Sequence, residues 1–250
     1  MGDIRVTVSY PGERPDEEHE GVQKLYKVGA NIAAGFAGNV DVGFRMISGM
    51  SASLNSSIPA DAIITEPSRF LAKWARRARH HWEHTVPVTE RQGGCSLLVM
   101  AALQPTGPFT RTVAYRLHAP DFNLDEIPPR TARSIGSGAD VSEYQATLER
   151  LGHDFFELVQ FETMYWPFGP APMIASELSD VIEVVGTPGI SPHLHICTVR
   201  FGEVEILTND RQALTPGVES RVMPPVVAGW EQWKAWKLER GLADLVAIAA

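Results

Sequence analysis

The alternation of apolar and polar positions predicts two strands in the first forty residues. Residues 3–9 alternate and end at a Tyr-Pro-Gly turn, and residues 25–36 form a longer run with a turn near Gly29. The stretch between them, residues 13–20, is mostly acidic, and we expect it to be a solvated loop.

Apolar residues then recur at intervals of three and four, which is typical of amphipathic helices. The predicted helices cover residues 40–54, 66–87, 140–155 and 174–185. The second of them starts at Glu66-Pro67-Ser68, where proline suits the first helical turn, and it ends at Pro87.

Between these helices lie apolar runs of strand length. The predicted strands cover residues 95–103, 110–118, 132–135, 194–201 and 204–208. The first two are joined by a proline-rich turn at residues 105–108, and the last two by a tight turn at Gly202. Helices that come in pairs between groups of strands indicate a layered α+β domain and not alternating βαβ units.

The end of the chain changes in composition, and this suggests three regions. Residues 1–208 form the domain, residues 209–229 a proline-rich linker, and residues 230–250 a C-terminal amphipathic helix with tryptophans three residues apart. This last helix either packs on its own domain or contacts another subunit.

Composition excludes several function classes. The formal net charge is −8 and no basic stripe is interleaved with aromatics, so a nucleic-acid partner is not expected. No apolar run reaches about 18 residues, and the first residues lack the pattern of a secretory signal, so we expect a cytoplasmic protein with no membrane partner. The two cysteines, Cys95 and Cys197, lie in apolar runs that predict buried free thiols.

Four short motifs resemble those of one family. They are Gly2-Asp3-Ile4-Arg5-Val6-Thr7, the strand that begins at Lys24, the turn Gly35-Phe36-Ala37-Gly38 and the turn Ile135-Gly136-Ser137-Gly138. Together with the order of elements, they resemble the proteasome beta-type subunits, the N-terminal-nucleophile hydrolases that include the bacterial double-ring ATP-dependent protease. The resemblance implies a four-layer αββα sandwich over residues 2–208.

The resemblance also implies a role for each matched residue. In this family an N-terminal Thr, Ser or Cys attacks the peptide carbonyl and its own amine acts as the base. Asp3 and Lys24 would tune that amine, Ser137 would relay protons, and the amide of Gly38 would hold the oxyanion. Thr7 would hold the substrate backbone by β-pairing. No cofactor or metal is implied.

The chain departs from the family pattern in two places that affect activity. The first strand and most of the second are missing, so the nucleophile would lie roughly 15 residues before Met1, and we expect the gene product to start upstream. Thr187 stands where the family has an aspartate, and a threonine cannot replace a carboxylate that orients a proton relay. The implied partners are a peptide or unfolded protein, further copies in a homo-oligomeric ring, and an ATPase. The alternative is a non-catalytic structural subunit that acts through ring assembly.

A rival motif points to a different class of enzyme. His80, Glu83 and His84 form His-x-x-Glu-His, which on a helix places two zinc ligands on one face with a glutamate as base. Glu157 or Glu162 would be a third ligand. The simpler interpretation is that histidines in a last helical turn interact with the helix dipole. His193 and His195 are a second possible metal pair, or else lie on an exposed strand face.

Overall fold

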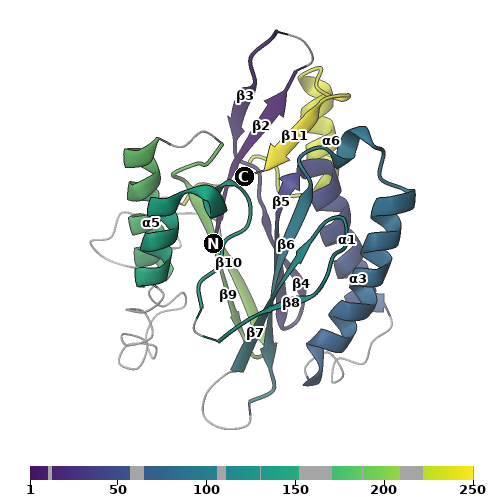
Figure 1. Ribbon diagram of the computed structural model, residues 1–250, viewed down its shortest axis with the longest axis vertical. Coiled ribbons are helices and arrows are strands. Elements are labelled where there is room, and N and C mark those ends of the chain that lie inside the picture. The colour runs from purple at the N-terminus through teal and green to yellow at the C-terminus, as the bar shows by residue number, and fades with distance from the viewer. Residues whose placement is uncertain are drawn as a thin grey trace.

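The computed structural model describes residues 1–10, 13–56, 65–105, 111–129, 131–151, 171–186, 189–208 and 222–249. Within these residues the chain is a mixed α+β protein with antiparallel sheets (Figure 1).

The larger sheet is eight-stranded, and its strands come from distant parts of the chain. Its order is β3 (Glu17–Glu20), β2 (Arg5–Ser9), β11 (Val246–Ala249), β5 (Ile32–Asn39), β6 (Cys95–Leu103), β7 (Arg111–His118) and β8 (Asp125–Ile127). The eighth strand, β4 (Leu25–Gly29), pairs with the first half of β5. The C-terminal strand β11 pairs with the second half of β5 on the same side as β4, so β4 and β11 follow one another along β5.

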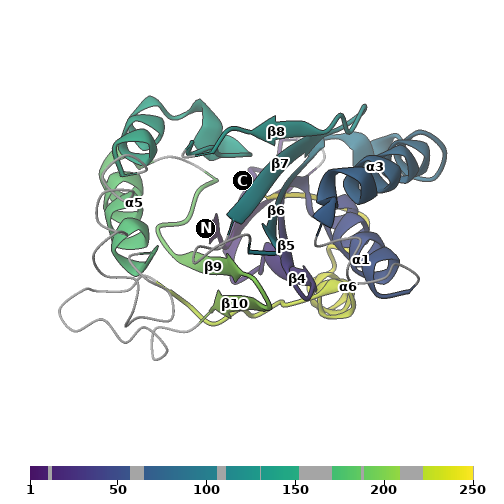
Figure 2. The same ribbon diagram turned by 90° about the horizontal axis from the view of Figure 1, so that it is seen from below.

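A three-stranded sheet packs against one face of the larger sheet (Figure 2). It consists of β1 (Gly2–Asp3), β9 (Leu194–Arg200) and β10 (Glu203–Leu207). Ala33 and Ala102 of the larger sheet form one buried cluster with Val199 and Val204 of the smaller sheet. The two sheets are therefore joined by direct apolar contact.

Helices lie on the outer side of each sheet (Figure 2). The helices α1 (Val40–Ser56), α3 (Pro67–His84) and α6 (Trp230–Glu239) cover the larger sheet. The helix α5 (Ala171–Val185) covers the smaller sheet together with helical residues 142–151. Two short 3₁₀ turns, η1 (Thr89–Arg91) and η2 (Ser137–Asp140), lie in connections.

Most elements form where the periodicity predicts them, including α1, α3 and α5 and the hairpins β6–β7 and β9–β10. Strand 25–36 is divided at the expected turn near Gly29 into β4 and β5. Residues 106–108 of the predicted turn, Phe155 and most of the linker lie outside the described residues.

Three expectations were wrong. The acidic stretch 13–20 is not all loop, because Arg5 forms ion pairs with Glu18 and Glu20 and so holds β3 beside β2. Residues 132–135 form no strand, since they join neither sheet. Ser134 and Ile135 instead line two cavities. The last helix ends at Glu239 rather than continuing to residue 250, because Gly241 turns the chain at φ 67° and leads it into β11.

The tryptophans of α6 pack on their own domain, as one of the two interpretations predicts. Trp233 is fully buried and stacks on Trp236 with ring centroids 5.1 Å apart. A buried ion pair, Lys237 Nζ to Asp41 Oδ1 at 2.8 Å, ties α6 to the start of α1. Both cysteines are free thiols, but only Cys95 is buried as expected, whereas Cys197 is half-buried. None of the described helices is both long enough and apolar enough to cross a bilayer.

Candidate functional site

Asp3 and Lys24 meet in a buried ion pair. Lys24 Nζ lies 2.9 Å from Oδ1 and 3.0 Å from Oδ2 of Asp3, and the Lys24 side chain is 2% exposed. The backbone N–H of Arg5 donates to the same carboxylate at 2.9 Å. Lys24 lies just before β4, where its carbonyl accepts the N–H of Phe36 at 3.2 Å. The pair is therefore held between β1, β2 and β5.

The electrostatics of this pair favour proton chemistry nearby. Burial lowers the pKa of Lys24, the charge and hydrogen bond of Asp3 oppose that effect, and the charge of Arg5 adds to it. A cation held in a region of low dielectric stabilises the neutral form of a neighbouring amine, which is the form that accepts a proton. This is the role that the family resemblance implies for Asp3 and Lys24.

A small cavity of about 110 Å³ borders the pair. Gly2, Phe36 and Tyr144 line it beside Asp3 and Lys24. Burial, and then the charge of Asp3, raise the pKa of Tyr144 to about 12. Tyr144 is therefore a neutral phenol near pH 7, and it closes the cavity without competing for protons.

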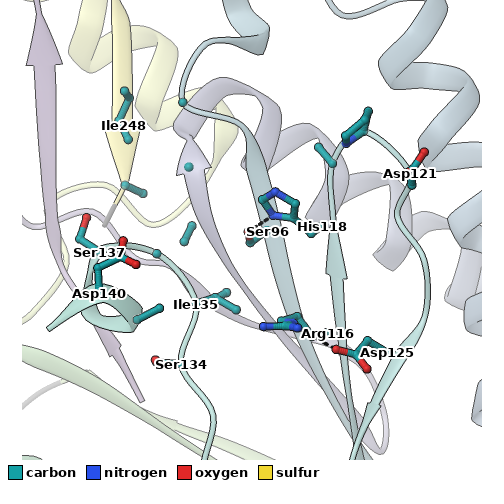
Figure 3. Close-up of a pocket in the computed structure, with 18 of the residues that line it drawn as sticks. Ser96, Arg116, His118, Asp121, Asp125, Ser134, Ile135, Ser137, Asp140 and Ile248 are labelled. Atoms are coloured by element: carbon teal, nitrogen blue, oxygen red, sulfur yellow. Dashed lines mark hydrogen bonds and ion pairs between the residues drawn. The ribbon is translucent and has the colours of Figure 1, made fainter. Parts of the chain in front are cut away.

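A second cavity, of about 760 Å³, adjoins the first because both are lined by Ser134 and Ile135. Gly38 and Ser137 both line the larger cavity. Ser137 and Ile248 of β11 lie on its wall in Figure 3. The fold thus gathers Asp3, Lys24, Gly38 and Ser137 on the walls of two adjoining cavities.

Gly38 occupies a position that requires glycine. Its φ is +95°, and a Cβ there would lie 2.7 Å from the carbonyl oxygens of Gly93 and Gly94. The next residue, Asn39, accepts the N–H of Val42 at 3.1 Å and so caps α1. Gly38 therefore lies at the N-terminal end of a long helix, where negative charge is stabilised.

Ser137 and Thr7 lie on two sides of the same turn. A Cβ built on Gly189 would lie 3.7 Å from Thr7 Oγ1 and 3.9 Å from Ser137 Oγ. Thr7 lies in the middle of β2, where it pairs with Glu18 of β3 and with Ile248 of β11. Both edges of β2 at Thr7 are thus occupied within this chain. Thr187 lies outside the described residues.

Sequence reasoning missed a carboxylate network beside Thr7. Glu20 accepts hydrogen bonds from Arg5 at 2.7 Å, from Ser191 Oγ at 2.9 Å and from His193 Nδ1 at 3.1 Å. Glu18 accepts the N–H of Gly189 at 2.7 Å. Residues 18 and 20 lie on one face of a strand, so their spacing of two could have indicated β3. The acidic composition of this stretch predicted a loop instead.

These contacts set the charge state of Glu20. Its partial burial favours the neutral carboxyl, but the hydrogen bonds from Arg5 and Ser191 and the charges of His193 and Arg5 prevail and lower its pKa. Glu20 is therefore ionised at neutral pH, and it fastens the turn after α5 to β2 and β3.

A serine and a histidine in the larger cavity were also missed. Ser96 Oγ lies 2.6 Å from His118 Nδ1, across the β6–β7 ladder, and Arg116 forms an ion pair with Asp125 nearby (Figure 3). The register of the two strands is the signal for such a pair, because pairing of residue 103 with residue 111 places residue 96 opposite residue 118.

The rival zinc motif lies on the last turns of α3. The rings of His80 and His84 are 4.4 Å apart between centroids, and Glu83 lies 3.9 Å from His84. Among the described residues no three metal-ligating side chains come together, and Glu157 and Glu162 lie outside that part of the chain.

The exposed strand face expected for His193 and His195 was wrong. His195 is fully buried, and its Nε2–H donates to the carbonyl of Met223 at 2.7 Å. His193 precedes β9 and bonds to Glu20 instead. The two histidines diverge because His193 lies before β9 begins at Leu194, so the two-residue period of the strand does not extend to it.

Comparison of the chain with protein-family models and with curated proteins gives no match.

Proposed function

We propose that this chain is a subunit of a proteasome-type N-terminal-nucleophile peptidase that hydrolyses peptide bonds. The observation that carries the proposal is the buried Asp3–Lys24 ion pair, which lies beside adjoining cavities walled by Gly38 and Ser137. A lysine is rarely this buried without a function or a structural need for its charge.

The arrangement of layers supports the same proposal. Helices α1, α3 and α6 cover the larger sheet, the smaller sheet packs on its other face, and α5 covers the smaller sheet. This order agrees with the αββα sandwich expected for the family. Because many activities share one fold, the function rests on the site and not on the layers.

In the proposed mechanism, the nucleophile is a Thr, Ser or Cys at the N-terminus of the mature chain, upstream of Gly2. Its α-amine, kept neutral by the ammonium of Lys24, takes the hydroxyl or thiol proton as the oxygen or sulfur attacks the peptide carbonyl. The amide of Gly38 would stabilise the oxyanion. The amine then protonates the leaving amine, and water hydrolyses the acyl-enzyme.

Ser137 would supply a proton relay, and the ionised Glu20 would hold the turn at Gly189 against Thr7. The proposed setting is a cytoplasmic ring of identical subunits, in which sequestered sites act on unfolded chains that an ATPase delivers. Sedimentation equilibrium of the native protein tests this assembly, since the mass of a ring is a whole multiple of the mass of one native chain.

The nucleophile is tested on the protein purified from its own cell. Intact mass and N-terminal sequencing identify the first residue, and a peptide β-lactone is used as an acylating probe. We expect one probe per chain, attached to a leading Thr, Ser or Cys. The variant Lys24→Met should lower the rate of labelling by roughly 10²–10⁴-fold. The matched control is Lys27→Met, since Lys27 is an exposed lysine on β4.

Two outcomes contradict the proposal. A native chain that starts at Met1 has no such nucleophile, and a folded Lys24→Met variant that labels at the normal rate removes Lys24 from the chemistry. A ring that assembles without labelling favours the non-catalytic structural subunit.

A further inference from the structure

The strand β11 lies where candidate site residues meet. Its residue Ile248 pairs with both Thr7 of β2 and Asn39 of β5, and Ala249 pairs with both Val6 and Gly38. Two residues assigned to substrate and oxyanion binding are thus neighbours of β11 in the sheet.

The position of β11 along β5 is informative. The strand β4 occupies the same edge of β5 up to the pair Leu25–Gly35, and the N–H of Phe36 bonds to the carbonyl of Lys24. The pairing of β11 begins at Gly38, roughly 7 Å further along the strand. The end of β11 at Ala249 therefore points along β5 toward Lys24.

The direction of β11 is that of the acyl side of a bound peptide. It runs antiparallel to β2 and β5, so successive residues approach Gly38 in the N-to-C sense. In a substrate, the residues N-terminal to the scissile bond precede its carbonyl. A peptide that takes the place of β11 with this carbonyl at Gly38 therefore runs in the same direction as β11.

The side chains of β11 alternate between two environments. Ala247 and Ala249 are buried in the core cluster that includes Val40 and Phe44 of α1. Ile248 points the other way and packs on Gly93, where a Cβ would lie 2.9 Å from its side chain, and both Ile248 and Ala249 border the larger cavity. The strand β11 thus fills a slot between β2 and β5. This slot accepts small side chains at alternate positions and a large one between them.

We propose that residues 246–249 are an internal peptide ligand of this slot, which a substrate strand must displace. The inference rests on the proposed function, and it adds a built-in competitor and a substrate class: extended peptides with small residues at alternate positions. The strand has four residues, which all pair with β2, but only two of them pair with β5, so exchange must break a short ladder on each side. The preceding helix α6 stays anchored by the Lys237–Asp41 pair.

The test uses the full chain and a fluorescent peptide, Leu-Val-Ala-Ile-Ala, which copies residues 245–249. Saturating peptide should accelerate hydrogen exchange of the amides in 246–249 and leave those of β6 unchanged. A variant that weakens β11, Ile248→Gly, should bind the peptide at least tenfold more tightly, because less of the slot is occupied. The matched control is Ala243→Gly, an exposed residue before the strand, and it should bind as the parent chain does.

A second peptide, Leu-Val-Leu-Ile-Leu, tests the size limit, and it should bind at least tenfold more weakly. If it binds equally well, or if exchange at 246–249 is unchanged by the first peptide and Ile248→Gly gives no gain, the proposal is overturned. These measurements need no nucleophile. A chain that exchanges β11 but never hydrolyses peptides contradicts the proposed function alone, and one that hydrolyses peptides without displacing β11 contradicts this inference alone.

Discussion

Single residues in this molecule are constrained by charge burial and by close backbone contacts. Lys24 is nearly inaccessible to water, and Asp3 compensates its charge at 2.9 Å. Gly38 lies against two carbonyl oxygens that exclude a side chain. These constraints make specific substitutions informative about the site.

Breaking the Asp3–Lys24 pair from either side should destabilise the fold. Asp3→Asn or Lys24→Met leaves a buried charge without its partner, and each should cost about 3–5 kcal/mol. The double variant should lose much less than the sum, because neither charge then remains. Urea unfolding of the four proteins measures this coupling, and strictly additive losses would show that the two groups act independently.

Gly38→Ala should destabilise the protein by about 1–3 kcal/mol, because a Cβ at positive φ is strained and meets the carbonyls of Gly93 and Gly94. Gly49→Ala is the matched control. Gly49 lies inside α1 with open space around it, so alanine there should be neutral or stabilise by about 0.5–1 kcal/mol. Thermal unfolding distinguishes them, and equal midpoints would remove the steric argument.

Elements that are distant in sequence are joined by polar side chains. The turn at residues 189–193 follows α5, yet it is bonded to β3 through Glu18 and Glu20. Because Thr7 lies between these groups, the shape of the site on that side depends on their charge.

The turn should loosen in acid. The pKa of Glu20 is lowered in the folded protein, so its contribution is complete above the unfolded value of about 4.5 and is lost as the pH falls toward the folded value. Protection factors for the amides of residues 189–191 and 193 should fall from pH 6 to pH 3.5. In Glu20→Gln they should be low at both pH values, whereas Glu13→Gln, at an exposed position, should behave as the parent. Protection that stays constant in the parent would contradict this role.

The whole molecule is joined by its larger sheet, in which residues 5–9, 17–20, 32–39 and 246–249 lie side by side. Two thiols also contribute, Cys95 in the core of the larger sheet and the half-buried Cys197 on β9 of the smaller sheet. Burial raises the pKa of Cys95 to about 12 and that of Cys197 to about 11. These groups link the stability of the entire fold to alkaline pH.

The free energy of unfolding should therefore decrease above pH 9. A thiol whose pKa is raised by folding favours the native state below its unfolded pKa of 9.0, and this contribution is lost as the pH rises toward the folded value. Urea midpoints at pH 8 and pH 10.5 measure the loss, which should be smaller in Cys95→Ala. If that variant and the parent lose the same amount, Cys95 does not contribute.

Local order along the chain was determined by the sequence itself. Apolar periods of two and of three to four mark α1, α3, α5 and most strands, because each element must bury one face wherever it lies. The motifs around Asp3, Lys24, Gly38 and Ser137 were selected in the sequence only by their resemblance to those of a known family, and their roles stay a proposal.

Only the tertiary structure decided which of these residues meet. The Asp3–Lys24 contact, the turn that places Gly189 between Thr7 and Ser137, and the network around Glu20 all join segments far apart in the chain. The most distant case is β11, where apolar residues 242–248 fit a helix by spacing. The open edge of β5 beyond β4, together with the turn at Gly241, makes residues 246–249 a strand instead. The free energy of strand pairing depends on the partner strand, which lies far away in the sequence, so no local pattern can predict it.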